Sequence, residues 1–299
     1  MTTRRFGVIV GSGLDKKKNP FGTEDVVHHQ IQTRIWPNPV VDLYEIPLGE
    51  NTSLVFTARH LEGHRLLPSE VNYRGIIFAM KKLGVEVVVG VSAVGSRRED
   101  IKPGTLAAVH QYIDRTKLRE QTFFGDGIVG HVSFGRPVCD RVEHDLLFTG
   151  HELGIPIESG RTLMVMEGPA FSTEAEIKAD LNQAALIGMT SMPEAKLARE
   201  AELCYCTLAC VTDYDSGIIP GRPSVTAEEV SQVFKTLKKS ATQVVREAAK
   251  RFFARNDGPC GCQTALDTAI MTDPNSIPGP KITRLGPILK RWADINLKK

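Results

Sequence analysis

The sequence predicts an α/β protein in which helices cover both faces of a central sheet. Short apolar runs alternate along the chain with stretches of helical periodicity, and the chain has no internal repeat or low-complexity segment. The runs that we expect to form strands are Phe6–Val10, Ser53–Ala58, Val85–Val91 and Leu203–Val211. The third is rich in valine, as is typical of a strand buried on both faces.

Helical patterns separate these strands. The spacing predicts a helix over Ser69–Lys82, with Ser69 as its N-cap and Gly84 at its end. A longer helix is expected from Thr226 to about Phe253, because Thr226 and Glu229 form a capping-box pattern. Apolar residues recur at helical spacing near its start and give it one apolar face. These residues are Val230, Val233, Phe234 and Leu237.

The last part of the chain differs in composition from the rest. From Asn256 to Pro287 it is rich in Gly, Pro and Asp, and Ile288–Asn296 predicts a short terminal helix. We therefore expect one domain, residues 1–255, followed by a C-terminal extension, residues 256–299, that packs on it.

The composition excludes several classes of protein. The 37 basic and 35 acidic side chains give a formal charge of +2, so the surface as a whole is not that of a nucleic-acid or membrane binder. The first apolar stretch, Phe6–Val10, is too short for a signal peptide, and no run reaches the roughly 20 residues of a membrane-spanning helix. We expect a cytosolic enzyme of ordinary composition.

The chain has six cysteines, and their spacing does not predict a metal site. Cys204, Cys206 and Cys210 lie in an apolar run, where thiols usually pack as small hydrophobes. Cys260 and Cys262 form a C-x-C pair, but metal sites usually combine C-x2–4-C spacing with a second ligand pair, and the sequence shows none. We expect no bound metal.

Three of the predicted strands end in residues suited to an anion. The first leads into Gly11-Ser12-Gly13, a turn that lets backbone N–H groups approach a ligand. The second ends at Arg59-His60, where the guanidinium matches phosphate geometry, and the third in the small residues of Ser92-Ala93-Val94-Gly95-Ser96. Because ligands in open α/β sheets bind at the carboxyl ends of the strands, these ends together indicate an oxyanion site.

Other interpretations of these motifs stay open. A dinucleotide fingerprint would need a third glycine where Lys16 stands, and Gly11-Ser12-Gly13 is also consistent with a plain strand-to-loop turn. His60 and His64 have the spacing of two metal ligands on a helix, but Gly63 weakens a helix there. An exposed Arg-His pair without a function is equally compatible with the pattern.

A second group of residues is compatible with a site for an aromatic base. Asp213 and Asp215 follow the last predicted strand, where acids commonly cap or form loops, but one could serve as a general acid. Phe171, within Glu167–Ser172, could stack on a ligand or belong to the core. Gly188–Glu194 precedes a helix whose first residue we expect to be Pro193.

In this order the motifs resemble the trimeric purine nucleoside phosphorylases, a family that includes the 5′-methylthioadenosine phosphorylases. The similarity runs from Phe6 to about Phe253 and also covers Val71-Asn72-Tyr73, Ile113–Thr116 and Arg119–Phe124. It implies a mixed twisted sheet flanked by helices, a homotrimer, and the displacement of a purine from a nucleoside by inorganic phosphate, with no cofactor. Some members of the family carry a C-x-C disulfide, so the redox state of Cys260 and Cys262 is open.

The resemblance also implies roles for individual residues. Asp213 and Asp215 would face N7 and the 6-amino group, Phe171 would pack on the purine, and Met189 would lie against the ribose. His131 would reach the 5′ site of a neighbouring subunit. The phosphate would be held by Ser12, Arg59, His60, Ser92, the Ala93 backbone and Thr190. Asp213 can donate a proton to the leaving purine only if burial raises its pKa above the usual value of about 3.9.

The choice of substrate depends on a few positions. Family members that act on 6-oxopurines carry Glu where this chain has Ser172 and Asn where it has Asp213, so these residues favour a 6-aminopurine. Val230, Val233 and Phe234 would suit a 5′-methylthio group, or they are simply core. The alternatives are a 6-oxopurine or methylthioinosine phosphorylase, towards which Gly188 points, and a non-catalytic nucleotide-binding module or a dinucleotide oxidoreductase.

Overall fold

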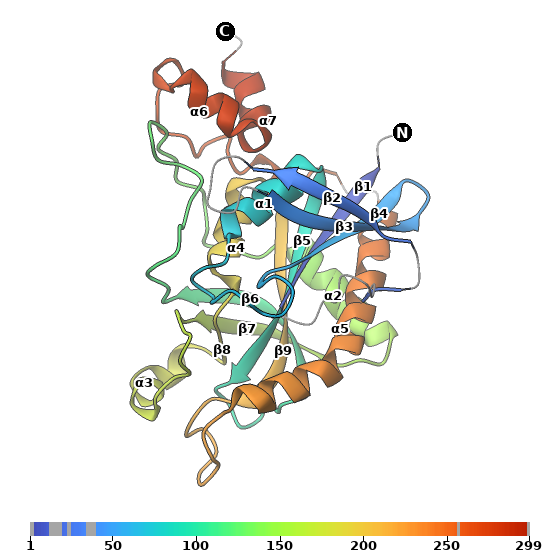
Figure 1. The fold of residues 1–299 in the computed structure, drawn as a ribbon, viewed down its shortest axis with the longest axis vertical. Helices are drawn as coiled ribbons and strands as arrows, with labels where there is room; N and C mark the ends of the chain where they lie inside the picture. The colour runs from blue at the N-terminus through green and yellow to red at the C-terminus, as the bar shows by residue number, and fades with distance from the viewer. Residues whose placement is uncertain (1–2, 12–19, 23–24, 34–39, 256–257, 298–299) are drawn as a thin grey trace.

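The structure is a computed structural model that describes residues 3–11, 20–22, 25–33, 40–255 and 258–297. Its described strands form one mixed sheet in the order β2-β3-β4-β1-β5-β8-β7-β6-β9 (Figure 1). Because β9 also pairs with β5, the strands from β5 to β9 form a closed ring. The strands are β1 (Arg4–Val10), β2 (Val27–Gln32), β3 (Val40–Gly49), β4 (Thr52–Ala58), β5 (Val85–Ser96), β6 (Leu106–Asp114), β7 (Ile157–Val165), β8 (Leu186–Gly188) and β9 (Cys204–Tyr214).

Helices cover both faces of this sheet, which confirms the predicted fold class. On one side, α1 (Tyr73–Lys82) and α4 (Ser191–Glu200) contribute to a cluster with Ile9 and Val88 of the sheet. On the other, α2 (Asp140–Glu152) and α5 (Ala227–Ala254) pack over residues such as Val8. The remaining helices are α3 (Glu174–Asp180), α6 (Gly279–Arg284) and α7 (Gly286–Asn296), with short 3-10 turns at 181–183, 261–264 and 274–276. No helix among the described residues is long and apolar enough to cross a bilayer.

Two predicted strands are longer than the sequence indicated. β5 continues past Val91 to Ser96, and β9 continues past Val211 to Tyr214. The two extensions pair with each other, with a register shift after Val94, and β8 pairs with Gly95 and Ser96. Ser92 and Asp213 therefore lie within strands, not after them, because cross-strand hydrogen bonds carry both strands beyond their apolar runs.

Helix α5 begins at the N-cap that its capping pattern predicts, whereas α1 begins later than predicted. Thr226 is the N-cap of α5, and its hydroxyl accepts from the N–H of Glu229. For α1 the N-cap is Asn72, whose side chain accepts from the N–H of Gly75, so the choice of Ser69 was wrong. Gly84 follows the end of α1 at a φ of 85°, a conformation that favours glycine.

The chain after α5 packs on α1 at one end of the molecule (Figure 1). Leu266, Ile288 and Trp292 are buried in the same cluster as Ile77 of α1. The terminal helix α7 includes the predicted segment Ile288–Asn296.

Candidate active site

The ends of β1, β4 and β5 meet at one edge of the sheet. β1 lies between the other two and is parallel to both, with Val10 level with Ala58 and Val91. The N–H of Arg59 donates to the carbonyl of Val10 at 2.9 Å. A Cβ on Gly11 would lie 4.0 Å from Nη1 of Arg59, so the turn after β1 faces the guanidinium. Ser12, the serine predicted to bind phosphate there, lies outside the described residues.

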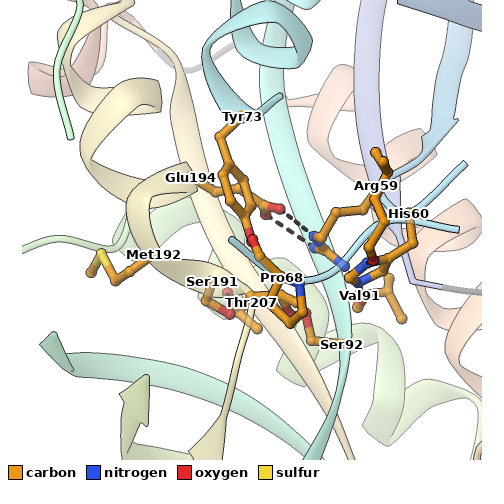
Figure 2. A network of polar contacts seen from close by, with 12 residues as sticks. Arg59, His60, Pro68, Tyr73, Val91, Ser92, Ser191, Met192, Glu194 and Thr207 are labelled. Atoms are coloured by element: carbon orange, nitrogen blue, oxygen red, sulfur yellow. Dashed lines mark hydrogen bonds and ion pairs between the residues drawn. The ribbon is translucent and has the colours of Figure 1, made fainter. Parts of the chain in front are cut away.

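Arg59 is not the exposed residue that the alternative interpretation required. It is 1% exposed, and its Nε and Nη2 form an ion pair with the carboxylate of Glu194 on α4, the second at 3.1 Å (Figure 2). Glu194 is also 1% exposed. Nη1 lies 3.4 Å from the carbonyl of Val91 and is left with donor capacity on the side of Gly11. The pair fixes the guanidinium with one edge directed to the strand ends.

A buried network extends this ion pair. The hydroxyl of Tyr205 donates to Glu194 at 3.0 Å and lies 3.1 Å from the hydroxyl of Thr207. Thr207 in turn donates to Ser191 at 3.2 Å, and Tyr112 donates to Thr207 at 2.8 Å. Ser191 and Glu194 belong to the predicted motif Gly188–Glu194, but the contacts within this network were not predicted. These hydrogen bonds connect the start of α4 to β6 and β9.

His60 is neutral at physiological pH. It is buried beside the guanidinium of Arg59, and desolvation, with a smaller contribution from that charge, lowers its pKa to about 4. Nδ1 lies 2.8 Å from the carbonyl of Leu66, which can only accept, so Nδ1 carries the hydrogen. Nε2 is therefore a hydrogen-bond acceptor. The ring stacks on His64 at 4.3 Å between centroids.

Two further predicted phosphate ligands meet across the sheet. The hydroxyls of Ser92 on β5 and Thr190, the residue before α4, lie 3.1 Å apart. The two hydroxyls meet because β8 pairs antiparallel with the end of β5, which places Thr190, two residues after β8, next to that strand. Ala93 follows Ser92 on the same strand. Met192 has an extended backbone, so the regular part of α4 starts at Pro193, as predicted.

Asp213 and Asp215 are both buried near the end of β9. Desolvation raises the pKa of Asp213, in the direction that a proton donor needs, although a hydrogen bond from the Thr212 hydroxyl at 2.6 Å acts against the rise. Desolvation raises the pKa of Asp215 to about 6, while Arg97 and the hydroxyl of Ser172 oppose it. Among the described residues, Oδ2 of Asp215 has no hydrogen-bond partner. Nε of Arg97 lies 3.5 Å from this oxygen in an ion pair, so Oδ2 faces one cation and keeps acceptor capacity for a further donor.

The other residues predicted to bind substrate are less enclosed. Phe171 is 40% exposed. Met189 packs over Gly168, whose φ is 70° and on which a Cβ would lie 2.5 Å from the sulfur of Met189. The segment that contains Gly168 is held by Arg119, which binds Glu167 at 2.8 Å and the carbonyl of Met192 at 2.6 Å. Sequence reasoning gave Arg119 no role.

The predicted 5′ wall lies next to the turn after β1, whereas His131 contacts the C-terminal part of the chain. Phe234 is buried, and its ring is 4.0 Å from where a Cβ on Gly11 would be. Val230 and Val233 are half-buried on the same helix. His131 is exposed, and its N–H donates to the carbonyl of Ala269 in the C-terminal part of the chain.

A separate cluster of cysteines forms away from these residues. The sulfur atoms of Cys139, Cys204, Cys260 and Cys262 all lie within 4.8 Å of one another. The C-x-C motif thus has two partner thiols, although the sequence shows no second pair at the spacing of metal ligands. Cys139 and Cys204 are 65 positions apart in the sequence, and only the fold brings them together.

Comparisons with known proteins agree with this geometry. A model of the phosphorylase superfamily matches residues 6–250. The chain is 42% identical over 292 residues to an S-methyl-5′-thioadenosine phosphorylase of Geobacter sulfurreducens, covering 96% of this chain and 99% of that one. It is 43% identical over 294 residues to an S-methyl-5′-thioadenosine phosphorylase of Chloroflexus aurantiacus, covering 98% of this chain and 99% of that one.

Solved structures give the same assignment. A methylthioadenosine phosphorylase from an antarctic soil metagenomic library superposes with a TM-score of 0.85 at 37% identity, over 97% of this chain and 100% of that one. The methylthioadenosine phosphorylase of Schistosoma mansoni, in complex with adenine, superposes with a TM-score of 0.78 at 28% identity. The match covers 85% of this chain and 93% of that one. The chain belongs to the phosphorylase superfamily, as its motifs predicted.

Proposed function

We propose that this protein catalyses phosphorolysis of 5′-methylthioadenosine to adenine and 5-methylthioribose 1-phosphate. The observation that carries the proposal is the similarity over nearly the whole chain to relatives named for this activity. The buried acids at the end of β9 and the Arg59 edge of the sheet supply the chemistry it requires. Such a reaction serves purine and methionine salvage, and we place it in the cytosol. Adenosine is a second substrate on this proposal.

Inorganic phosphate is a co-substrate, and no cofactor is needed. Nη1 of Arg59, the hydroxyls of Ser12, Ser92 and Thr190, and the Ala93 backbone would hold its oxygens. Nε2 of the neutral His60 would accept from the protonated oxygen of hydrogen phosphate. An anion held below the sugar stabilises the oxocarbenium-like charge that develops as the glycosidic bond lengthens.

The two acids serve the departing base. Asp213, protonated, would donate to N7 of the purine, and Oδ2 of Asp215 would accept from the 6-amino group. Phe171 would cover the ring, Ser172 would support Asp215, and Met189 would contact the ribose. Val230, Val233 and Phe234 would line the methylthio group.

We also propose a homotrimer, in which His131 of one subunit reaches the 5′ group bound by its neighbour. The exposure of His131 in the single chain supports a role at a subunit contact.

The direct test is incubation with 5′-methylthioadenosine, with and without phosphate. We expect adenine only when phosphate is present, measured by chromatography. Release of adenine in water alone would indicate a hydrolase, and no turnover would contradict the proposal. A preference for methylthioinosine or inosine would select the 6-oxopurine alternative.

The pH dependence should follow Asp213. Because the protonated carboxyl donates, kcat/KM should fall as pH rises through its pKa. The Thr212 hydroxyl stabilises the charged form, so Thr212→Val should raise that pKa and move this alkaline limb to higher pH. Thr212→Ser keeps the hydroxyl and should leave the limb in place. An identical limb in Thr212→Val would assign the titration to another group.

A further inference from the structure

The cysteine cluster has the geometry of a metal site. Its four sulfur atoms lie within 4.8 Å of one another, and those of Cys139 and Cys260 are 3.6 Å apart. A tetrahedral zinc ion with Zn–S bonds of about 2.3 Å requires sulfur atoms about 3.8 Å apart. Small side-chain adjustments would therefore bring all four into coordination distance.

The backbone around the cluster is held in place. Cys139 is the N-cap of α2, and its N–H donates to the carbonyl of Tyr205 at 2.9 Å, next to Cys204 at the start of β9. The N–H of Gln263 donates to the sulfur of Cys260, and the Gln263 side chain accepts from the N–H of Cys260 at 3.1 Å. Such N–H groups commonly orient the ligands of a metal.

The segment that carries the C-x-C pair is also fastened from α2. The guanidinium of Arg141 donates to the carbonyl of Gly258 at 2.6 Å and to that of Pro259 at 3.3 Å. Cys260 is the N-cap of the 3-10 turn at 261–264 and Cys262 lies within that turn, and the sulfur atoms of both lie close to those of Cys139 and Cys204. Three separate parts of the chain thus converge on one point.

The remaining two cysteines are different. Cys206 and Cys210 lie on β9 and are fully buried, and the Cys206 thiol donates to the carbonyl of Val109. They pack as small apolar side chains. Burial in this strand therefore does not by itself draw thiols together, and the convergence of the other four needs a separate explanation.

We propose that Cys139, Cys204, Cys260 and Cys262 bind one structural Zn²⁺ ion. Binding would form four Zn–S bonds and release the four thiol protons to solvent. With four protein ligands the ion has no open position, so it does not act on substrate. Cys204 and Asp213 lie at opposite ends of β9, about 30 Å apart. The ion would fasten the start of the C-terminal part of the chain to α2 and β9.

The test is the metal content of the protein purified under reducing conditions without chelator. We expect about one zinc per chain by elemental analysis, and visible absorption typical of tetrahedral thiolate after replacement by Co²⁺. Cys139→Ala and Cys262→Ala should lose the metal and lower the unfolding temperature by about 10 °C. The matched variant Cys206→Ala, from the same strand, should keep it.

Two results would overturn the proposal, and both can be read from the wild-type protein even if the variants do not fold. One is a metal-free chain with six titratable thiols that takes up no Zn²⁺ or Co²⁺. The other is a metal-free chain with an intact mass lower by four hydrogen atoms, which would show two disulfides instead. Neither readout depends on the proposed reaction.

Discussion

Replacing Asp213 with Asn should reduce kcat/KM for 5′-methylthioadenosine about 10²–10³-fold and raise the relative activity on 6-oxopurine nucleosides. The Thr212 hydroxyl donates to Oδ1 of Asp213, so the amide of the variant should keep its carbonyl there. Its NH₂ would then occupy the position of Oδ2, beside Gly95. An N–H at that position can donate to N7 and to the neighbouring 6-oxo group of hypoxanthine, whereas the amide cannot give N7 of departing adenine the proton that the Asp213 carboxyl gives.

The measurement is the ratio of kcat/KM for methylthioadenosine to that for methylthioinosine, in both proteins. The alkaline limb of the pH profile should also disappear, because the amide does not titrate. An unfolding temperature close to that of the wild type would show that the fold is intact. Equal losses of kcat/KM on both substrates would mean that Asp213 does not discriminate between the two bases.

The fold could be predicted because its strands are marked by their own residues. Val85–Val91 and Phe6–Val10 are apolar enough to be assigned without knowledge of their neighbours. The extensions of β5 and β9 could not be assigned, since small and polar residues such as Ser92 and Asp213 stay in the strands only through their partners. The N-cap of α1 was misplaced because Ser69 and Asn72 are both good caps, and the turn before the helix decides between them.

Candidate site residues could be named one by one from the sequence, but the contacts that support them could not. Arg59 stands out as a candidate phosphate ligand because of its chemistry and its position after a strand. Its partner Glu194 is 135 positions away and carries no local signal, since a buried glutamate reads as an ordinary helix residue. The same holds for Cys139 and Cys204, which became neighbours of the C-x-C pair only through the fold. The order of the motifs in the sequence indicated the family, but only the fold shows which of the motifs contact one another.

The second large effect should follow removal of the Glu194 carboxylate. In Glu194→Ala the guanidinium of Arg59 would remain buried without its counter-ion, and the Tyr205 hydroxyl would lose one of its two hydrogen-bond partners. Breaking a buried pair by removing one partner typically costs about 3–5 kcal/mol of unfolding free energy. For a chain of this size we expect an unfolding temperature about 10 °C lower. Asp100→Ala, which breaks an exposed pair with Arg98, should change it little.

Catalysis by the Glu194 variants separates positioning from stability. In Glu194→Gln the side chain keeps its volume but loses the charge that orients Arg59, so KM for phosphate should rise about tenfold or more, with a smaller change in KM for the nucleoside. A purely structural role would lower the amount of active enzyme and leave both KM values unchanged. If the two KM values rose in parallel, Arg59 would not be the phosphate ligand, and the anion would have to be bound by other residues. The difference between the two KM effects therefore tests whether the buried pair of Arg59, which follows β4, and Glu194, on α4, directs Nη1 towards phosphate.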